Sequence, residues 1–209
     1  GTGFVGSKTI AKLNSILTAG VPAEEVPAEE VPAEEVPVVP VVGENKVSLT
    51  ADNPAAATIA KGAQDVIFAK VNFCAASEAN TVSKIILTRG GVAADADLST
   101  IKIYEGTTQV GSSHAINSNT HKATFSSLNW TISANSCKVL TLKASIAAAA
   151  TAGDTPKLSI AAASDITSTV TLDGVFPISS NAMTVAGISV GALNVATTTP
   201  SGSVVAGAT

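Results

Sequence analysis

Alternating apolar and polar residues, interrupted by short turn-forming pairs, dominate the chain from Lys46 onward. Two segments carry apolar side chains at every second position: Ile67, Ala69, Val71 and Phe73, and then Leu140, Leu142, Ala144 and Ile146. A period of two places such side chains on one face of a β-strand. No long stretch with the helical period intervenes, which favours an all-β fold, an antiparallel β-sandwich, over a parallel sheet with crossover helices.

The same pattern predicts further strands along the chain. They are expected at residues 82–88, 101–104, 123–125, 158–162, 169–172, 175–178 and 183–190. Pairs typical of turns separate them: Gly90-Gly91, Glu105-Gly106, Gly153-Asp154 and Asp173-Gly174. Together these elements predict one sandwich domain over residues 46–190.

The charge distribution limits the classes of partner. The net charge is −4, but six of the sixteen acids are glutamates between residues 24 and 35, and residues 36–209 hold ten bases and ten acids. A neutral body with a single arginine, Arg89, is a poor partner for nucleic acid, so none is expected. Low net charge favours self-association instead.

Residues 1–20 predict a short helix, because Ser7 can cap it and Gly20 can end it. The stretch GTGFVGSKTIAKLNSIL resembles the closing segment of small helical peptidoglycan-binding domains of bacterial wall and surface proteins. The resemblance implies that residues 1–20 are the remnant of such a domain in a longer precursor. It makes cell wall or surface glycans candidate partners.

Residues 21–45 predict an extended linker. Three perfect copies of VPAEE fill residues 21–35, and VPVVPVV follows. Proline at every fifth position blocks helix and central-strand pairing, and the glutamates repel one another, which favours a conformation near polyproline II. Two interpretations remain: a solvated spacer, or a segment whose valine-rich end, residues 36–42, lies along another subunit.

The order of the β-rich segments resembles a known type of repeat. The segments are DNPAAATIAKGAQDVIFAKVNF, SKIILTRGG, LSTIKIYEGTTQVG, KATFSSLNWTISANSCKVLTLKASI and FPISSNAMTV. They are similar to the immunoglobulin-like repeats found in tandem in large surface proteins of uncultivated, small-genome bacteria. The resemblance covers residues 46–186, and it implies an immunoglobulin-like antiparallel β-sandwich in an extracellular, cell-surface protein.

Few residues suit catalysis or metal binding, so no enzyme activity and no cofactor are expected. His114 and His121 flank a turn and offer at most a weak metal pair, and Asp95 and Asp97 offer two oxygens to calcium without a third acid. The ordinary interpretation is loop histidines and turn carboxylates. Trp130 alternates with two apolar residues and is expected to pack in the core or at a strand edge rather than stack on a sugar.

Cys74 and Cys137 are the only cysteines, and their spacing matches no redox or metal motif. They either bridge the two sheets of the sandwich in an exported protein or remain separate buried thiols. No apolar run approaches the roughly 18 residues of a membrane span, and no signal peptide is recognised at Gly1.

Residues 191–209 repeat the beginning of the sandwich. ALNVATTTPSGSVVAGAT follows the pattern of VSLTADNPAAATIAKGAQ at residues 47–64, with Pro200 at the place of Pro54. The segment is therefore expected to be an orphan strand, since a strand without a sheet leaves its N–H and C=O groups unpaired.

Two functions follow from this orphan strand. In the first, the chain is a structural subunit of an extracellular filament that polymerises head-to-tail by strand donation. Gly191 is the expected hinge of the donated tail, whose apolar residues are Ile188, Val190, Leu193, Val195, Val204 and Val205. In the alternative, the chain is one module of a tandem-repeat, peptidoglycan-anchored adhesin or surface stalk, and the tail begins the next repeat.

Overall fold

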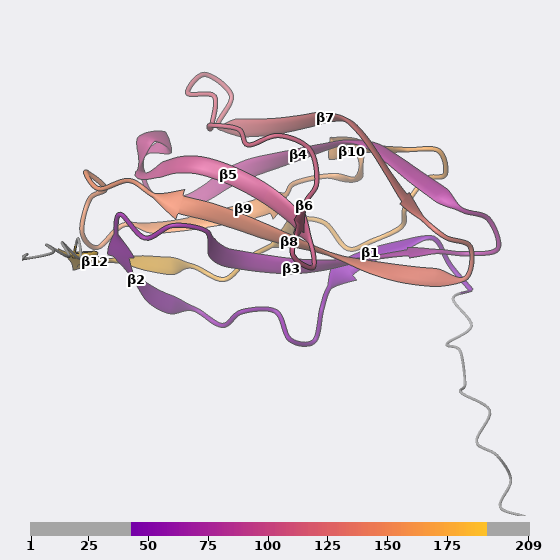
Figure 1. Cartoon of the computed structure of the whole chain (residues 1–209), viewed down its shortest axis with the longest axis horizontal. Coiled ribbons are helices and arrows are strands. Elements are labelled where there is room, and N and C mark those ends of the chain that lie inside the picture. The colour runs from indigo at the N-terminus through magenta and orange to yellow at the C-terminus, as the bar shows by residue number, and fades with distance from the viewer. Residues whose placement is uncertain (1–42, 192–209) are drawn as a thin grey trace, which may run out of the picture. The chain divides into compact units, whose positions relative to one another are not determined.

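The computed structural model describes residues 43–191, and within them the chain consists almost entirely of β-strands (Figure 1). The predicted helix at 1–20, most of the linker at 21–45 and the tail beyond Gly191 lie outside the described residues. The strands are β1 Lys46–Leu49, β2 Ala57–Lys61, β3 Val66–Ala75, β4 Asn80–Val92, β5 Leu98–Glu105, β6 Thr108–Gln109, β7 Lys122–Ile132, β8 Ser136–Ile146, β9 Thr155–Ile160, β10 Ile166–Ser168, β11 Ile178–Ser179 and β12 Met183–Ser189. Two 3₁₀ turns, η1 Asp95–Asp97 and η2 Ala163–Asp165, are the described helices, and neither is long enough to cross a membrane.

The strands form two five-stranded antiparallel sheets. The first has the order β1-β3-β8-β5-β6, so that β3 and β8 lie in its centre and β1 forms one edge. The second has the order β10-β4-β9-β11, with β7 paired to β4 as well. The predicted all-β, antiparallel architecture is confirmed for this part of the chain.

A third, two-stranded sheet departs from the antiparallel pattern. In it β12 pairs in parallel with β2, from Met183 opposite Ala57 to Ser189 opposite Lys61. The N–H of Gly153 donates to the Val185 carbonyl, and the N–H of Val185 donates to the Asp154 carbonyl, which joins β12 to the segment before β9. The last described strand is thus held by main-chain bonds on both sides.

Side chains of both large sheets form one hydrophobic core. Phe68 and Phe73 of β3, Phe125 of β7, and Leu140 and Leu142 of β8 are all fully buried. Removing this much apolar surface from water is the main stabilising contribution to a fold with few aromatic residues.

The predicted alternation holds in β8 but fails at the start of β3. In β8 all four predicted inward residues are buried. In β3 the register shifts between Ile67 and Ala69, so Phe68 turns into the core and Ile67 turns outward. A bulge inserts one residue and reverses the side-chain direction beyond it, which a strict period of two does not anticipate.

The predicted turn at Gly90-Gly91 is wrong. Both glycines lie inside β4, where they pair with Lys157 and Pro156 of β9. Gly91 has φ +77°, and a Cβ added there would lie 2.0 Å from the Thr155 carbonyl oxygen. Glycine is needed here for a left-handed conformation and a close strand-to-strand approach.

Two predicted strands near the end of the domain also need correction. Residues 169–172 do not form a strand, because the N–H of Val170 and the Thr169 hydroxyl bond to the Asn80 side-chain oxygen. The strand predicted at 175–178 is reduced to β11, whose first residue is Ile178. Pro177 precedes it and has no N–H to donate to a neighbouring strand.

Candidate strand-docking edge

The strand before the tail ends at one end of the molecule. β12 leaves the domain at its last residues, and the side chains of Ile188 and Val190 are 70% and 57% exposed. The N–H of Val190 still donates to the Lys61 carbonyl at 3.0 Å, and Gly191 is exposed. The predicted tail residues Leu193, Val195, Val204 and Val205 lie outside the described residues.

The opposite half of the molecule holds the edge strand β1 (Figure 1). The N–H of Thr50 donates to the Lys70 carbonyl, on the side of β3, whereas the N–H of Val47 donates outward to the Asp173 carbonyl. Main-chain groups of a strand alternate between its two neighbours. The N–H and C=O of Leu49 therefore point outward, and among residues 43–191 no main-chain bond beyond the pairing of β1 with β3 engages them.

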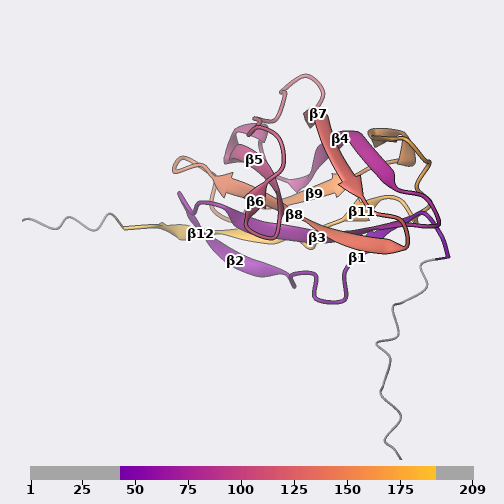
Figure 2. The ribbon, with the colours of Figure 1, turned by 45° about the vertical axis from the view of Figure 1, so that its right-hand side comes forward.

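A groove of about 320 Å³ lies along this outer edge of β1. Its lining comes from β1 and from the segment that leads into β11: Lys46, Val47, Ser48, Leu49, Val175, Pro177 and Ile178. In Figure 2, β1 and β11 lie near each other, away from β12. The lining is mainly apolar, and Val175 is 91% exposed, so the groove leaves a large apolar side chain in water.

Gly174 covers the first part of the outer edge of β1. A Cβ at this position would lie 2.6 Å from the Val47 carbonyl oxygen, so the main chain of Gly174 packs directly on β1. The bond between Val47 and Asp173 lies beside it. The free part of the β1 edge is thus confined to Leu49 and the residues that follow.

The segment that the tail repeats contributes to two sheets. Residues 47–64 begin in β1, at the edge of the first sheet, and continue into β2, which pairs with β12. With Pro54 aligned on Pro200, Val47 corresponds to Leu193 and Leu49 to Val195. The tail thus carries the apolar pattern of a strand that lies against this core.

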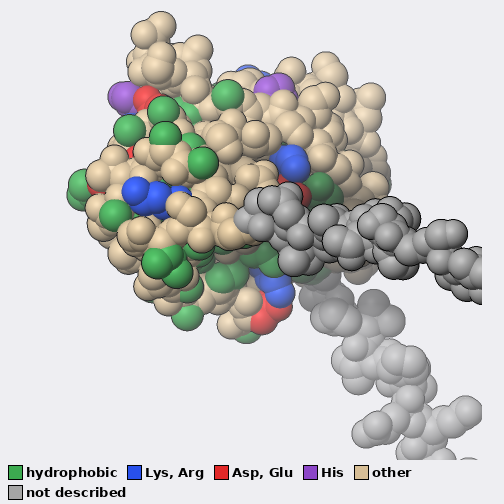
Figure 3. Space-filling model, turned by 60° about the vertical axis from the view of Figure 1, so that its left-hand side comes forward, with side chains coloured by type: hydrophobic (Ala, Val, Ile, Leu, Met, Phe, Trp, Pro, Cys, Tyr) green, Lys and Arg blue, Asp and Glu red, His purple; other side chains and the backbone are tan. Residues whose placement is uncertain are grey.

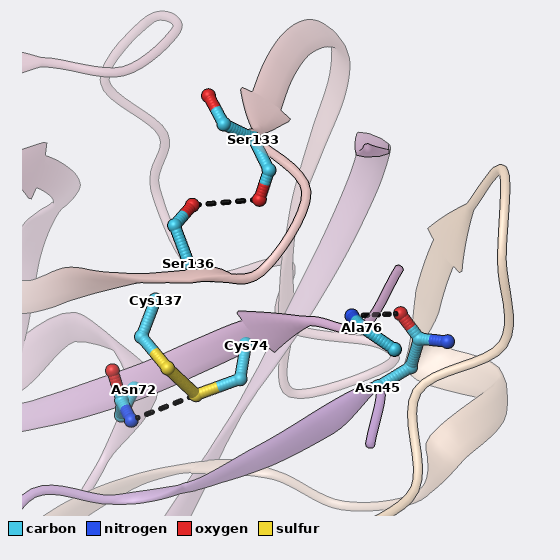
Figure 4. Close-up of a disulfide and its surroundings, with 7 residues drawn as sticks. All are labelled: Asn45, Asn72, Cys74, Ala76, Ser133, Ser136 and Cys137. Carbon is cyan, nitrogen blue, oxygen red and sulfur yellow. Dashed lines mark hydrogen bonds between the residues drawn. A yellow bond between two sulfur atoms is a disulfide. The ribbon is translucent and has the colours of Figure 1, made fainter. Parts of the chain in front are cut away.

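The two cysteines form a disulfide, but not between the sheets (Figure 4). Cys74 and Cys137 are paired residues of the neighbouring strands β3 and β8, with Cα atoms 4.0 Å apart. Asn72 Nδ2 lies 3.2 Å from Cys74 Sγ, and Cys137 is exposed. The bond therefore fastens two strands of one sheet on its outer face, and it points to an oxidising, extracytoplasmic location.

The aspartates of the loop at 95–97 bind different partners. Asp95 Oδ1 accepts from Arg89 Nε at 2.8 Å, and its Oδ2 lies 2.7 Å from His121 Nδ1. Burial opposes ionisation of Asp95, but these hydrogen bonds outweigh it and lower the pKa of its carboxyl. Asp97 instead accepts main-chain N–H groups of Ala94 and Thr151.

The two histidines also have separate partners. His121 bonds to Asp95, whereas the His114 ring packs edge-on against Phe125 at 4.7 Å. Within the described residues, no three histidine, cysteine, aspartate or glutamate side chains form a group that could hold a metal ion.

Trp130 lies in the core, and Lys138 Nζ lies 6.0 Å from the centre of its ring. Its ring meets Phe73 edge-on at 5.2 Å, and its Nε1 donates to Glu105 Oε2 at 2.7 Å. Lys138 Nζ lies 2.9 Å from the other oxygen of Glu105. Hydrogen bonds from Lys138 and Trp130 lower the pKa of Glu105. A buried ring face leaves no platform for a sugar.

Sequence reasoning missed the acceptor side of the groove. Val175 and Pro177 were expected inside a strand, and only the contact of Gly174 with Val47 places them at the open edge. Sequence reasoning also missed Asp154, which lies near Asp97. A hydrogen bond with Asp97 and, to a smaller extent, burial raise the pKa of Asp154. These contacts join residues that are far apart in sequence, so no local sequence pattern predicts them.

The described surface is mixed rather than strongly charged. On the face that Figure 3 presents, charged side chains are few and lie among apolar and uncharged ones. A scan against protein-family models and a search of curated proteins gave no match for this chain.

Proposed function

We propose that this chain is a structural subunit of an extracellular, cell-surface filament, whose copies join head-to-tail by donating a C-terminal strand. One observation carries the proposal: the strand that leads into the tail ends at one end of the described domain, whereas β1, with its open edge, lies in the other half (Figure 1). Donor and acceptor are then different surfaces. A contact between different surfaces that does not close a ring grows into a fibre.

The chemistry of the two surfaces supports strand donation. An open edge recruits extended segments, because main-chain bonds supply affinity while alternate side chains fill pockets. Leu193 and Val195 have the required spacing, and the segment 192–209 contains no charged residue. The disulfide supports an exported subunit, and the neutral body of residues 36–209 presents little net charge to keep copies apart.

Deleting residues 192–209 tests the proposal. Electron microscopy and sedimentation should show fibres for the whole chain and monomers for the shortened one. A variant lacking residues 21–35, which removes the charged linker but keeps the tail, is the matched control and should still polymerise. Fibres of unchanged length and number after the tail is removed would rule out strand donation.

The sequence repeat also supports a second function. If residues 192–209 begin the next domain of one long polypeptide, the chain is a module of a tandem-repeat surface stalk, anchored through a wall-binding domain such as the one that residues 1–17 resemble. The mass of the polypeptide isolated from its native source separates the two. A mass near 20.7 kDa favours a filament subunit, and a several-fold heavier chain favours the stalk.

A further inference from the structure

We propose that the groove between β1 and residues 175–178 is the acceptor for the tail of a neighbouring copy, with Leu193 and Val195 as the inserted side chains. The inference rests on the proposed strand donation and adds the site and the register. It identifies the occupant as residues 192–199 of a second copy of this chain.

The groove offers an extended segment both kinds of contact. The outward N–H and C=O of Leu49 supply main-chain hydrogen bonds on the side of β1. The apolar lining, including Leu49 and the exposed Val175, surrounds the space that the inserted side chains enter. Side chains two positions apart lie on the same face of a strand, so Leu193 and Val195 enter together.

The register follows from the part of the β1 edge that is already covered. Gly174 and the bond between Asp173 and Val47 occupy the first part of the β1 edge. The donated strand therefore pairs from Leu49 onward and does not extend beside Lys46. Pro200 ends this pairing on the tail, because it has no N–H to donate.

The composition of the tail favours it over the valine-rich segment at 36–42. That segment has prolines at positions 37 and 40, and each proline removes a donor that an added strand needs. Residues 192–199 contain no proline and no charged side chain, so burying them does not remove a charge from water. A neighbouring copy supplies the tail because β12 leaves its own domain in the half of the molecule opposite to the groove.

Crosslinking between two single variants tests the site. Chains carrying Val175→Cys are mixed with chains carrying Val195→Cys, with the native disulfide intact, and oxidised; peptide mapping should find a 175–195 crosslink in dimers. Val92→Cys is the matched control, because Val92 is also exposed but lies away from the groove. Val92 pairs with the first residue of β9, whereas the groove residue Ile178 pairs with the last residue of the same strand. It should crosslink to Val195→Cys at least about tenfold less.

Charge substitution gives a second measurement. Val175→Asp should raise the critical concentration for polymerisation at least about tenfold, because docking would bury a charged carboxylate in a mainly apolar groove. Val92→Asp should change it by less than about twofold. Both side chains are largely exposed, so thermal unfolding of the monomer should be unchanged in either variant.

The outcomes separate the two proposals. If Val175→Asp polymerises normally and tail deletion still abolishes fibres, the groove is the wrong acceptor while strand donation stands. A crosslink from Val175→Cys to Val38→Cys instead of Val195→Cys identifies the 36–42 segment as occupant and overturns the inference. If a Val175→Cys/Val195→Cys double variant forms the crosslink within one chain rather than between two, the tail docks on its own domain, and the inference is also overturned. Fibres that survive tail deletion overturn both proposals.

Discussion

At the scale of single residues, two glycines with nearly the same positive φ have different roles. Gly62 has φ +76° with no other atom within 4 Å of an added Cβ, whereas Gly91 has φ +77° and faces the Thr155 carbonyl oxygen. Gly62→Ala should cost about 1 kcal/mol of the free energy of unfolding, from backbone strain alone. Gly91→Ala adds a clash within the sheet and should cost about 2–4 kcal/mol.

Urea unfolding followed by the fluorescence of Trp130, the single tryptophan, measures both losses. Gly62→Ala serves as the control for strain without a clash. Equal losses in the two variants would show that the approach of β4 to β9 tolerates a methyl group.

Asp154 carries a residue-scale prediction about pH. A hydrogen bond with Asp97 and burial raise the pKa of Asp154 above its ordinary 3.8, so the folded chain holds this proton more tightly than the unfolded chain. The resulting stability is present below pH 3.8 and is lost as the pH rises through the folded-state pKa. Asp154→Asn removes this loss and should raise the unfolding temperature at about pH 7 but not at about pH 3.

Calorimetry of the variant and the unsubstituted chain at the two pH values checks this. Asp97→Asn is the contrasting variant: Asp97 accepts two main-chain N–H groups, so its substitution should destabilise at about pH 7. A stability gain for Asp154→Asn that is the same at both pH values would contradict ionisation as the cause.

At the scale of elements, the disulfide fastens the two central strands of the first sheet. Cys74 and Cys137 are 63 residues apart in sequence, and their link restricts the unfolded chain. The double variant Cys74→Ala/Cys137→Ala should lose about 2–4 kcal/mol of the free energy of unfolding. Because Cys137 is exposed, a reductant should produce the same loss in the unsubstituted chain without prior unfolding.

Urea titrations with and without reductant measure this effect, and the double variant should show no further change with reductant. A native chain that keeps its full stability after complete reduction would contradict a structural role for the link.

The elements also show what the sequence could predict and what it could not. Long strands such as β3 and β8 were predicted because many alternating residues repeat the same signal. β6 and β11 have two residues each, too few for any period. The parallel pairing of β2 with β12, and the disulfide within one sheet, depend on which strands become neighbours, and side-chain alternation carries no such information.

Only one half of the candidate site, the donor strand, could be predicted from the sequence. The repeat between residues 47–64 and 192–209 is visible in the sequence, so the donor could be predicted. The acceptor could not, because it exists only where Gly174 packs on β1 and leaves Val175 in solvent.

At the scale of the whole molecule, the distribution of charge predicts how assembly responds to solution conditions. Residues 36–209 are neutral, the tail is uncharged, and the groove is lined mainly by apolar side chains. Raising the salt concentration from about 0.05 M to about 0.5 M screens only exposed charges, so the critical concentration should change by less than about twofold. Cooling should raise it, because hydrophobic stabilisation weakens at low temperature.

Light scattering across a salt series and a temperature series measures both responses. Six glutamates between residues 24 and 35 are the one strong concentration of charge, and the variant lacking residues 21–35 removes it. Any small salt effect of the whole chain should disappear in that variant. A tenfold or larger rise in the critical concentration with salt, retained in the variant without the glutamates, would mean that charged groups of the β-domain hold the copies together. Strand insertion into an apolar groove would then be the wrong mechanism.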